Sequence, residues 1–409
     1  RTYIVSMTEE PSDILEVLLL FKIAGVKRKL PLAPLLETPE ALENGERILG
    51  ALLSLPYYRA YVGDCQQVML GYSDSAKRSG RLASGWLLHQ VQRQLNDLAQ
   101  TKKVRFEFFH GRGGSIGRGG GPVHLALLAL PRGNGDGRLR VTEQGESVHG
   151  KFGLPGIAER SMELYVSGIL EAAVSKAPAE KKNWFSIMDQ LSQDSNRTFR
   201  EFIYERPEFL SYFAQVTPIQ ELSLYKIGSR PSRRKQTFDF ESLRAIPWVY
   251  SWTQNRGLLP SWLGLGEALE ASIERGELSH LKRMYREWPF FKATMSLFEM
   301  VLAKVDIPVF NQYSDFLVEE DQKKMSLEII KSYKLAVKNL NRLTGHKVLL
   351  EDNPVLRRSI NVRTPYVDVL NILQCHFLKV YRENPENPWV KKIIALTIGG
   401  ISAGMRNTG

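Results

Sequence analysis

Residues 104–122 read VRFEFFHGRGGSIGRGGGP, and this stretch decides how the first part of the chain folds. Its apolar opening, 104–109, is typical of a strand, and seven of the fourteen residues from 109 to 122 are glycine. Glycine lets backbone N–H groups approach an anion, while Arg112 and Arg118 add charges that bind anions in a bidentate manner. The stretch predicts a strand that ends in an anion-binding loop. Its spacing fits neither a dinucleotide fingerprint nor a P-loop, and a plain glycine linker rarely carries two arginines and a histidine.

The sequence before this stretch alternates between strand-like and helix-like patterns. Strand-like runs occupy residues 3–7, 30–36 and 67–72, and helix-like runs occupy residues 11–24, 39–58 and 81–101. Such a βα repeat predicts a parallel sheet or barrel, in which the chemistry lies at the carboxyl ends of the strands.

Polar side chains follow the ends of three predicted strands. Glu37 comes after the second strand, Asp74 and Lys77 come after the third, and His110 and Arg112 come after the fourth. Because parallel strands end at the same edge of a sheet, we expect these side chains to gather at one face.

From residue 156 onward the pattern is mainly helical. Helical periodicity is found in residues 158–175, 183–205, 262–305, 315–344 and 366–382. We therefore expect an α/β fold that is mostly α-helical. Residues 1–155 would form βα units of a TIM-type β/α barrel, and residues 156–409 a large helical region with the remaining barrel segments.

Composition limits the partners and the compartment. The net charge is +11, from 55 Lys and Arg against 44 Asp and Glu, which favours an anionic partner such as a small polyanionic substrate or nucleic acid. The only two cysteines are Cys65 and Cys375, so we expect no disulfide framework. We therefore expect a cytoplasmic location. No apolar run is long enough for a bilayer, so no membrane partner is expected. The strand-like opening after Arg1 suggests a start inside a larger fold, or else a terminus exposed by processing.

Five segments together resemble the phosphoenolpyruvate carboxylase family. They are FHGRGGSIGRGG (109–120), GYSDSAK (71–77), RVTEQGE (140–146), LRAIPWVYSWTQNR (243–256) and GMRNTG (404–409). The motifs are long and specific, and the similarity runs from residue 1 to residue 409 in the family's order. The resemblance implies the C-terminal half of an enzyme that adds bicarbonate to phosphoenolpyruvate and releases oxaloacetate and phosphate.

The resemblance also implies a divalent metal, Mg²⁺ or Mn²⁺. Glu37 in LLET and Asp74 in YSDS match the family's two metal ligands, and hard oxygen ligands suit these ions. Taken alone, each acid would more often be a solvated charge or a helix cap. Leu36 stands where the family commonly has Phe, a difference that should alter packing and leave ligation intact.

Several cations match family positions around the substrate. The resemblance gives Arg112, Arg118 and Lys77 a catalytic role, and it gives Arg112, Arg244 and Arg230 a role in substrate binding. In the implied mechanism bicarbonate attacks the phosphorus, giving carboxyphosphate and the enolate of pyruvate, and the enolate then attacks CO₂. A closing glycine-rich loop would exclude water from the enolate.

Feedback inhibition by aspartate or malate is a further implication. Lys304, Arg363 and Asn407, together with Arg118, match the family's effector-binding positions. Capture of Arg118 by the inhibitor would take a catalytic residue away from the active site. The resemblance also implies the N-terminal half of the enzyme as a partner, and a homotetramer when the enzyme is complete.

The family's essential histidine lies in a Thr-Ala-His-Pro-Thr motif of the N-terminal half, and this sequence has no such motif. We therefore expect the chain alone to be inactive, and we assign His110 a structural or loop-positioning role. The first alternative is a catalytically incomplete regulatory module that keeps the anion and effector sites. The second, a nucleic-acid binder, is disfavoured because the basic residues are spread along the chain without a known binding motif.

Overall fold

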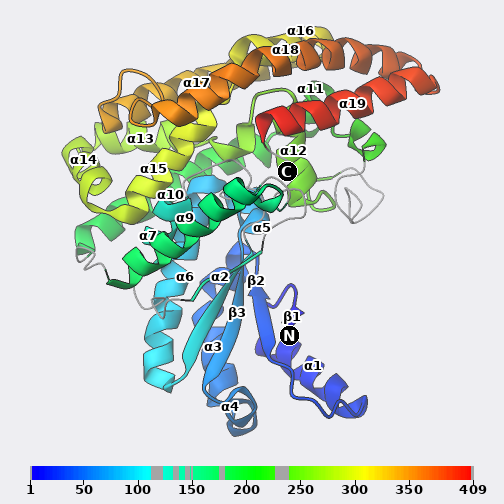
Figure 1. The fold of residues 1–409 in the computed structure, drawn as a ribbon. Coiled ribbons are helices and arrows are strands. Elements are labelled where there is room, and N and C mark those ends of the chain that lie inside the picture. Colours follow the sequence, from blue (N-terminus) through cyan, green and yellow to red (C-terminus); the bar gives the residue numbers. More distant parts are fainter. Residues whose placement is uncertain are drawn as a thin grey trace.

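The computed structural model describes residues 2–111, 123–131, 138–142, 148, 151–174, 180–225 and 239–406. A parallel sheet with its own helices forms one end, and a thick layer of helices forms the other (Figure 1). The strands are β1 (Tyr3–Val5), β2 (Leu32–Leu36), β3 (Cys65–Gly71), β4 (Arg105–Gly111) and β5 (Arg140–Val141). The four strands predicted before the glycine-rich segment are confirmed, with ends shifted by up to two residues.

The strands lie in chain order, β1-β2-β3-β4-β5, and every neighbouring pair is parallel. Leu36 of β2 pairs with Leu70 of β3, and Gly71 at the end of β3 pairs with Gly111 at the end of β4. The carboxyl ends of β2, β3 and β4 therefore finish nearly level. The predicted α/β class is confirmed, whereas closure into a TIM-type barrel stays a prediction.

Six helices accompany these strands. They are α1 (Pro11–Ile23), α2 (Pro39–Glu43), α3 (Gly45–Ser54), α4 (Pro56–Val62), α5 (Ser73–Ser79) and α6 (Arg81–Lys102). The prediction of a single helix over 39–58 is wrong, because the chain breaks near Asn44 and again at Leu55. Leu55 has an extended backbone with ψ 119°, the conformation expected of a residue that precedes proline.

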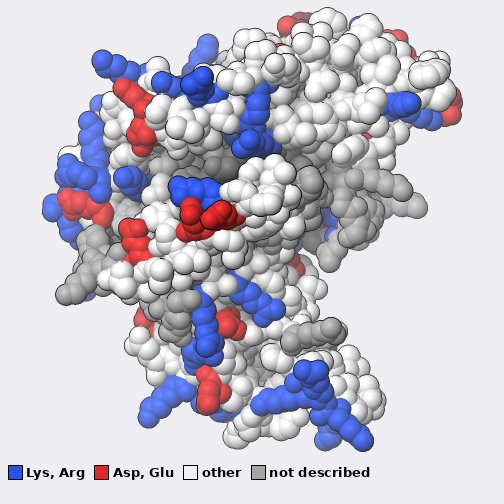
Figure 2. Space-filling view, viewed as in Figure 1, with Lys and Arg blue, Asp and Glu red and all other residues white. Residues whose placement is uncertain are grey.

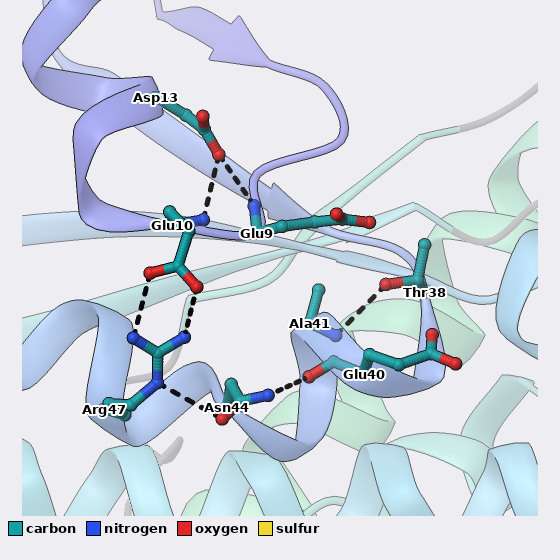
Figure 3. A network of polar contacts seen from close by, with 8 residues as sticks. All are labelled: Glu9, Glu10, Asp13, Thr38, Glu40, Ala41, Asn44 and Arg47. Carbon is teal, nitrogen blue, oxygen red and sulfur yellow. Dashed lines mark hydrogen bonds and ion pairs between the residues drawn. The ribbon is translucent and has the colours of Figure 1, made fainter.

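A polar network fixes the chain where it leaves β1 and β2 (Figure 3). Thr38, directly after Glu37, caps α2 by accepting a hydrogen bond from Ala41 N at 3.0 Å. Arg47 of α3 donates to both carboxylate oxygens of Glu10 at 2.8 and 2.9 Å, which ties α3 to the start of α1. These contacts set the direction of the backbone on both sides of the strand ends.

The remaining helices build the upper layer of Figure 1. They are α7 (Val123–Leu128), α9 (Pro155–Val174), α10 (Lys182–Ile203), α11 (Phe209–Val216), α12 (Ala245–Gln254), α13 (Leu265–Glu274), α14 (Leu278–Glu287), α15 (Pro289–Leu302), α16 (Ile307–Leu317), α17 (Lys323–Thr344), α18 (Pro354–Glu383) and α19 (Pro388–Met405). The periodic run 262–305 is three helices, interrupted at Gly276, which has φ +79°, and before Pro289. The run 366–382 is only the second half of α18, which continues through Pro365.

Two hydrophobic cores support the two ends. The sheet core packs strand residues such as Leu36 and Val68 against the surrounding helices. The helical core is rich in buried aromatic side chains such as Trp248 and Trp262. Helix α6 belongs to both, since Leu82 and Trp86 lie in the helical core while Val91, Leu95 and Leu98 lie in the sheet core.

None of the described helices combines the length and the apolar character needed to cross a bilayer.

Candidate functional site

Three strand ends converge on Glu37. A Cβ on Gly71, at the end of β3, would lie 2.4 Å from Glu37 Cβ and 2.6 Å from Glu37 Cα, so only glycine permits this approach. After β1, Met7 has φ +53° and its N–H donates to Glu37 Oε1 at 2.9 Å. The side chain of Glu37 is thus held by backbone geometry from both neighbouring strands.

Asp74 follows the same β3 end by three residues and lies in the first turn of α5. The Ser73 hydroxyl is 3.4 Å from Asp74 Oδ2. Glu37 and Asp74 are both half-buried, and they follow paired strands. Two carboxylates in this arrangement could supply oxygen ligands to a hard divalent cation and leave positions for water and substrate.

Lys77 connects α5 to the segment that carries Arg244. Its buried ammonium donates to the carbonyl oxygens of Phe240 and Leu243, the latter at 2.7 Å. Arg244 follows Leu243 directly and is the N-cap residue of α12. The structure thus brings Lys77 and Arg244, far apart in the sequence, to neighbouring positions beside the strand ends.

His110 at the end of β4 is buried and paired. Its Nδ1 lies 2.9 Å from Tyr72 Oη, and its carbonyl accepts from Thr142 N at 3.0 Å. These contacts fit the structural role expected of it. Gly111, the next residue, approaches Leu70 so closely that a Cβ would lie 2.9 Å from the Leu70 carbonyl oxygen.

Four predicted site residues lie outside the described residues. They are Arg112 and Arg118 of the glycine-rich segment, Arg230, and Asn407 near the end of the chain. Their predicted roles stay predictions.

At the other end of the molecule, cations gather around a small recess. Lys304, Arg363 and Gly404 line it, and Arg363 Nη1 donates to Gly404 O at 2.7 Å. Lys304 is only 5% exposed. Burial, and then the charges of Arg363 and Arg406, lower the pKa of Lys304 to about 7. Burial and Arg406 also lower the pKa of Arg363. Converging positive charges of this kind favour an anion.

Two residues of this region were not predicted from the sequence. Arg406 adds positive charge near Lys304 and Arg363, and Arg256 contacts the backbone of Lys304. Arg256 is 2% exposed, its Nη1 donates to Asp368 Oδ1 at 2.9 Å, and its Nε lies 3.4 Å from the Lys304 carbonyl. Both arginines lie inside segments that carry the family resemblance, WTQNR and GMRNTG. The sequence therefore pointed to these segments without giving either arginine a role.

A separate group with metal-ligand side chains is Glu299, His346 and Asp352, whose donor atoms lie within 4.8 Å of one another. Glu299 Oε1 already accepts from His346 Nδ1 at 2.7 Å and from Leu350 N at 2.8 Å. These contacts fasten the turn after α17 to α15. The group includes neither Glu37 nor Asp74.

Comparison with known proteins gives a consistent result. A family model described as phosphoenolpyruvate carboxylase matches residues 1–409. Proteins named phosphoenolpyruvate carboxylase from Shewanella halifaxensis, Hahella chejuensis and Tolumonas auensis are each 43% identical to this chain. The alignments cover 100% of this chain and 47%, 46% and 47% of those proteins, respectively. The chain therefore spans about half the length of the curated relatives it matches.

Proposed function

The chain belongs to the phosphoenolpyruvate carboxylase family, and from this premise we propose that it is the C-terminal portion of an enzyme that carboxylates phosphoenolpyruvate. Bicarbonate is the second substrate, and oxaloacetate and phosphate are the products. The observation that carries the proposal is the placement of Glu37 and Asp74 at adjacent strand ends, with Lys77 and Arg244 beside them.

Glu37 and Asp74 would hold Mg²⁺ or Mn²⁺. Their carboxylate oxygens suit a hard cation, and the glycine-dependent approach of β3 keeps Glu37 next to the segment that carries Asp74. When bound, the cation supplies Lewis-acid stabilisation of negative charge on substrate oxygen.

The protein's cations have a separate task, because phosphoenolpyruvate and bicarbonate are both anions. We assign Arg112, Arg230 and Arg244 to the substrate phosphate. An oxygen of bicarbonate attacks phosphorus, the bond from phosphorus to the enol oxygen breaks, and carboxyphosphate and the enolate form. Carboxyphosphate releases CO₂, to which the enolate carbon bonds. Arg118 would act in this carboxylation step.

Lys77 fits this scheme in two ways. The resemblance gives it a catalytic role, while its contacts with the carbonyls of residues 240 and 243 give it a positioning role toward Arg244. Fixing Arg244 before substrate arrives lowers the entropic cost of holding the phosphate.

Inhibition by aspartate or malate is proposed at the cation recess, with Lys304, Arg363, Asn407 and Arg118 as the binding residues. The recess lined by Lys304 and Arg363 has a volume of about 10 Å³, which is room for about one water molecule. A dicarboxylate would therefore select a more open arrangement, and inhibition would be a shift between two populations.

The complete enzyme would also need the N-terminal half, and we propose a cytoplasmic homotetramer. The alternative is a regulatory module of the same family that keeps the cation recess without turnover. A nucleic-acid partner is disfavoured, because Lys and Arg side chains are scattered over the face shown in Figure 2, with acidic residues among them.

The test is an oxaloacetate assay on the purified 409-residue chain, checked by mass, and then on the same chain mixed with the N-terminal half of a relative. We expect no turnover alone and turnover after mixing, because the carboxylation histidine would come from the added half. Matched mixtures with Glu37→Gln should lose activity. Turnover by the chain alone would refute the interpretation that its active site is incomplete. Absence of turnover in every mixture that forms a stable complex would favour the regulatory module.

A further inference from the structure

A recess of about 110 Å³ lies between α6, α7 and α15, and its described lining includes neither the candidate metal acids nor the residues of the cation recess. Most of its described lining is apolar, including Leu88 of α6, Leu125 of α7, and Phe290 and Leu297 of α15, and its polar members besides His89 are Tyr72, Arg81, Gln92 and Thr294. Apolar cavities of about 150 Å³ in other proteins take up benzene, so this volume corresponds to roughly one small ring.

One polar group in this lining is unusual. His89 is 3% exposed and its ring packs between aromatic neighbours, with the Phe290 ring centroid 4.1 Å away. Its Nε2 lies 3.1 Å from Glu180 Oε1, and Trp288 Nε1 donates to the same oxygen at 3.0 Å. Its other nitrogen, Nδ1, is buried without a hydrogen-bond partner among the described residues.

The protonation state of His89 follows from these contacts. Burial lowers the pKa of His89, and the hydrogen bond to Glu180 only partly offsets this effect. The ring is therefore neutral near pH 7. Because Glu180 accepts from Nε2, the proton lies on Nε2 and Nδ1 is a hydrogen-bond acceptor. A buried acceptor without a partner costs free energy that a donor on a ligand would recover.

We propose that this recess is a binding site for a small, neutral, mostly apolar ring that carries one hydrogen-bond donor, with His89 as the acceptor. The apolar walls bind the ring and the histidine selects the donor. The inference rests on the recess alone and holds whether or not the proposed carboxylase activity is correct.

The lining of the recess is connected to elements that carry predicted site residues. Helix α6 begins two residues after α5, which carries Asp74 and Lys77. Helix α15 ends two residues before Lys304. Tyr72, whose hydroxyl contacts His110, also lines the recess. A ligand here would touch elements joined to both the strand-end acids and the cation recess.

The chain offers a position from which a larger side chain would extend into the recess. Gly85 of α6 lines it, and a Cβ added there would meet no atom within 4 Å. Gly85→Leu should therefore fold, and glycine replacement within a helix favours the helix. Gly156 of α9 has equally open space, so Gly156→Leu is the matched control away from the recess.

Binding is measured by ligand-observed NMR and thermal shift, with phenol, toluene and benzoate as probes. Phenol has the required donor, toluene has the ring alone, and benzoate has an anionic acceptor. We expect phenol to bind at millimolar concentration, about tenfold more tightly than toluene, because one hydrogen bond to Nδ1 is added. Benzoate should bind more weakly than phenol.

Variants of the chain test whether phenol binds in this recess. Gly85→Leu should weaken phenol binding at least about tenfold, while Gly156→Leu should leave it unchanged. His89→Phe should remove the preference for phenol over toluene. Absence of phenol binding to the folded chain, equal binding by the Gly85→Leu variant, or tighter binding of benzoate would each overturn the proposal. If His89→Phe does not fold, comparison of the Gly85→Leu and Gly156→Leu variants still tests whether phenol binds in the recess. The ratio of phenol affinity to toluene affinity in the unmodified chain still tests whether a hydrogen-bond donor is required.

Discussion

The two ends of the molecule collect opposite charges by different means. At the sheet end, Glu37 and Asp74 are half-exposed carboxylates, placed by the ends of paired strands and by the contact at Gly71. At the helical end, Lys304 and Arg363 line one recess, where burial and neighbouring positive charges lower the pKa values of both side chains. The acidic site should therefore be sensitive to backbone shape, and the cationic site to pH.

The largest effect is expected from the acids themselves. In a mixture with an N-terminal half, Glu37→Gln and Asp74→Asn should each lower turnover by about a hundredfold to a thousandfold, since each removes a charged metal ligand. Metal titrations at saturating substrate measure the change. If both variants give the same metal titration as the unmodified chain, these two residues are not the ligands.

The next largest effect tests the role of backbone shape. Gly71→Ala should destabilise the chain by about 3 kcal/mol, because the new methyl group would overlap the Cα and Cβ of Glu37. Urea unfolding measures the loss. Gly63→Ala is not a suitable control because Gly63 has φ +69°, whereas Gly50→Ala is, since its nearest neighbour would be at 3.8 Å. Equal stability of the Gly71 and Gly50 variants would show that the strand ends can separate freely.

A smaller effect is expected for the link between α5 and α12. Lys77→Met should raise KM for phosphoenolpyruvate about tenfold, because two carbonyl oxygens of the segment before Arg244 lose the hydrogen bonds that the Lys77 ammonium donates. Lys77→Arg, which keeps donors and charge, should recover part of the affinity. A fall in kcat with an unchanged KM would instead assign Lys77 to the chemical step.

The smallest effect concerns pH at the cation recess. With the pKa of Lys304 near 7, the side chain loses its charge as pH rises through neutrality, so inhibition by aspartate should weaken about fivefold between pH 6 and pH 8. Lys304→Arg should flatten this dependence. Inhibition constants measured across this range decide the matter, and a pH-independent constant in the unmodified chain would contradict the assignment.

The same pKa has a consequence for stability. The unfolded chain keeps the Lys304 proton up to its ordinary pKa of 10.5, whereas the folded chain releases it near 7. Between these values the unfolded state binds more protons, so this group makes the folded state more stable as pH rises.

Sequence patterns predicted the sheet end better than the helical end. Strand-end placement of Glu37 and Asp74 followed from the βα repeat, because parallel strands must finish at one edge. The approach of Gly71 to Glu37 could not be predicted, since it depends on how two strands pair. Lys304 and Arg363 have no shared local pattern, and only the family resemblance connected them. The contacts of Lys77 with residues 240 and 243 join segments more than 160 positions apart, which periodicity cannot reveal.

The predicted helix boundaries were wrong where a glycine or a proline interrupts a periodic run. The run 262–305 kept its apolar spacing through Gly276 and Pro289, although the chain turns at both positions. Apolar spacing reports which side of a segment faces a core, and it does not report whether the helix axis continues.

Helix α6 gives the molecule a mechanical property that neither end has alone. Because Trp86 lies in one core and Val91, little more than a turn further on, lies in the other, neither core can come apart without exposing part of the same helix. Heat or denaturant should therefore melt both ends in one transition, and amide hydrogens near the middle of α6 should exchange with solvent among the slowest in the chain.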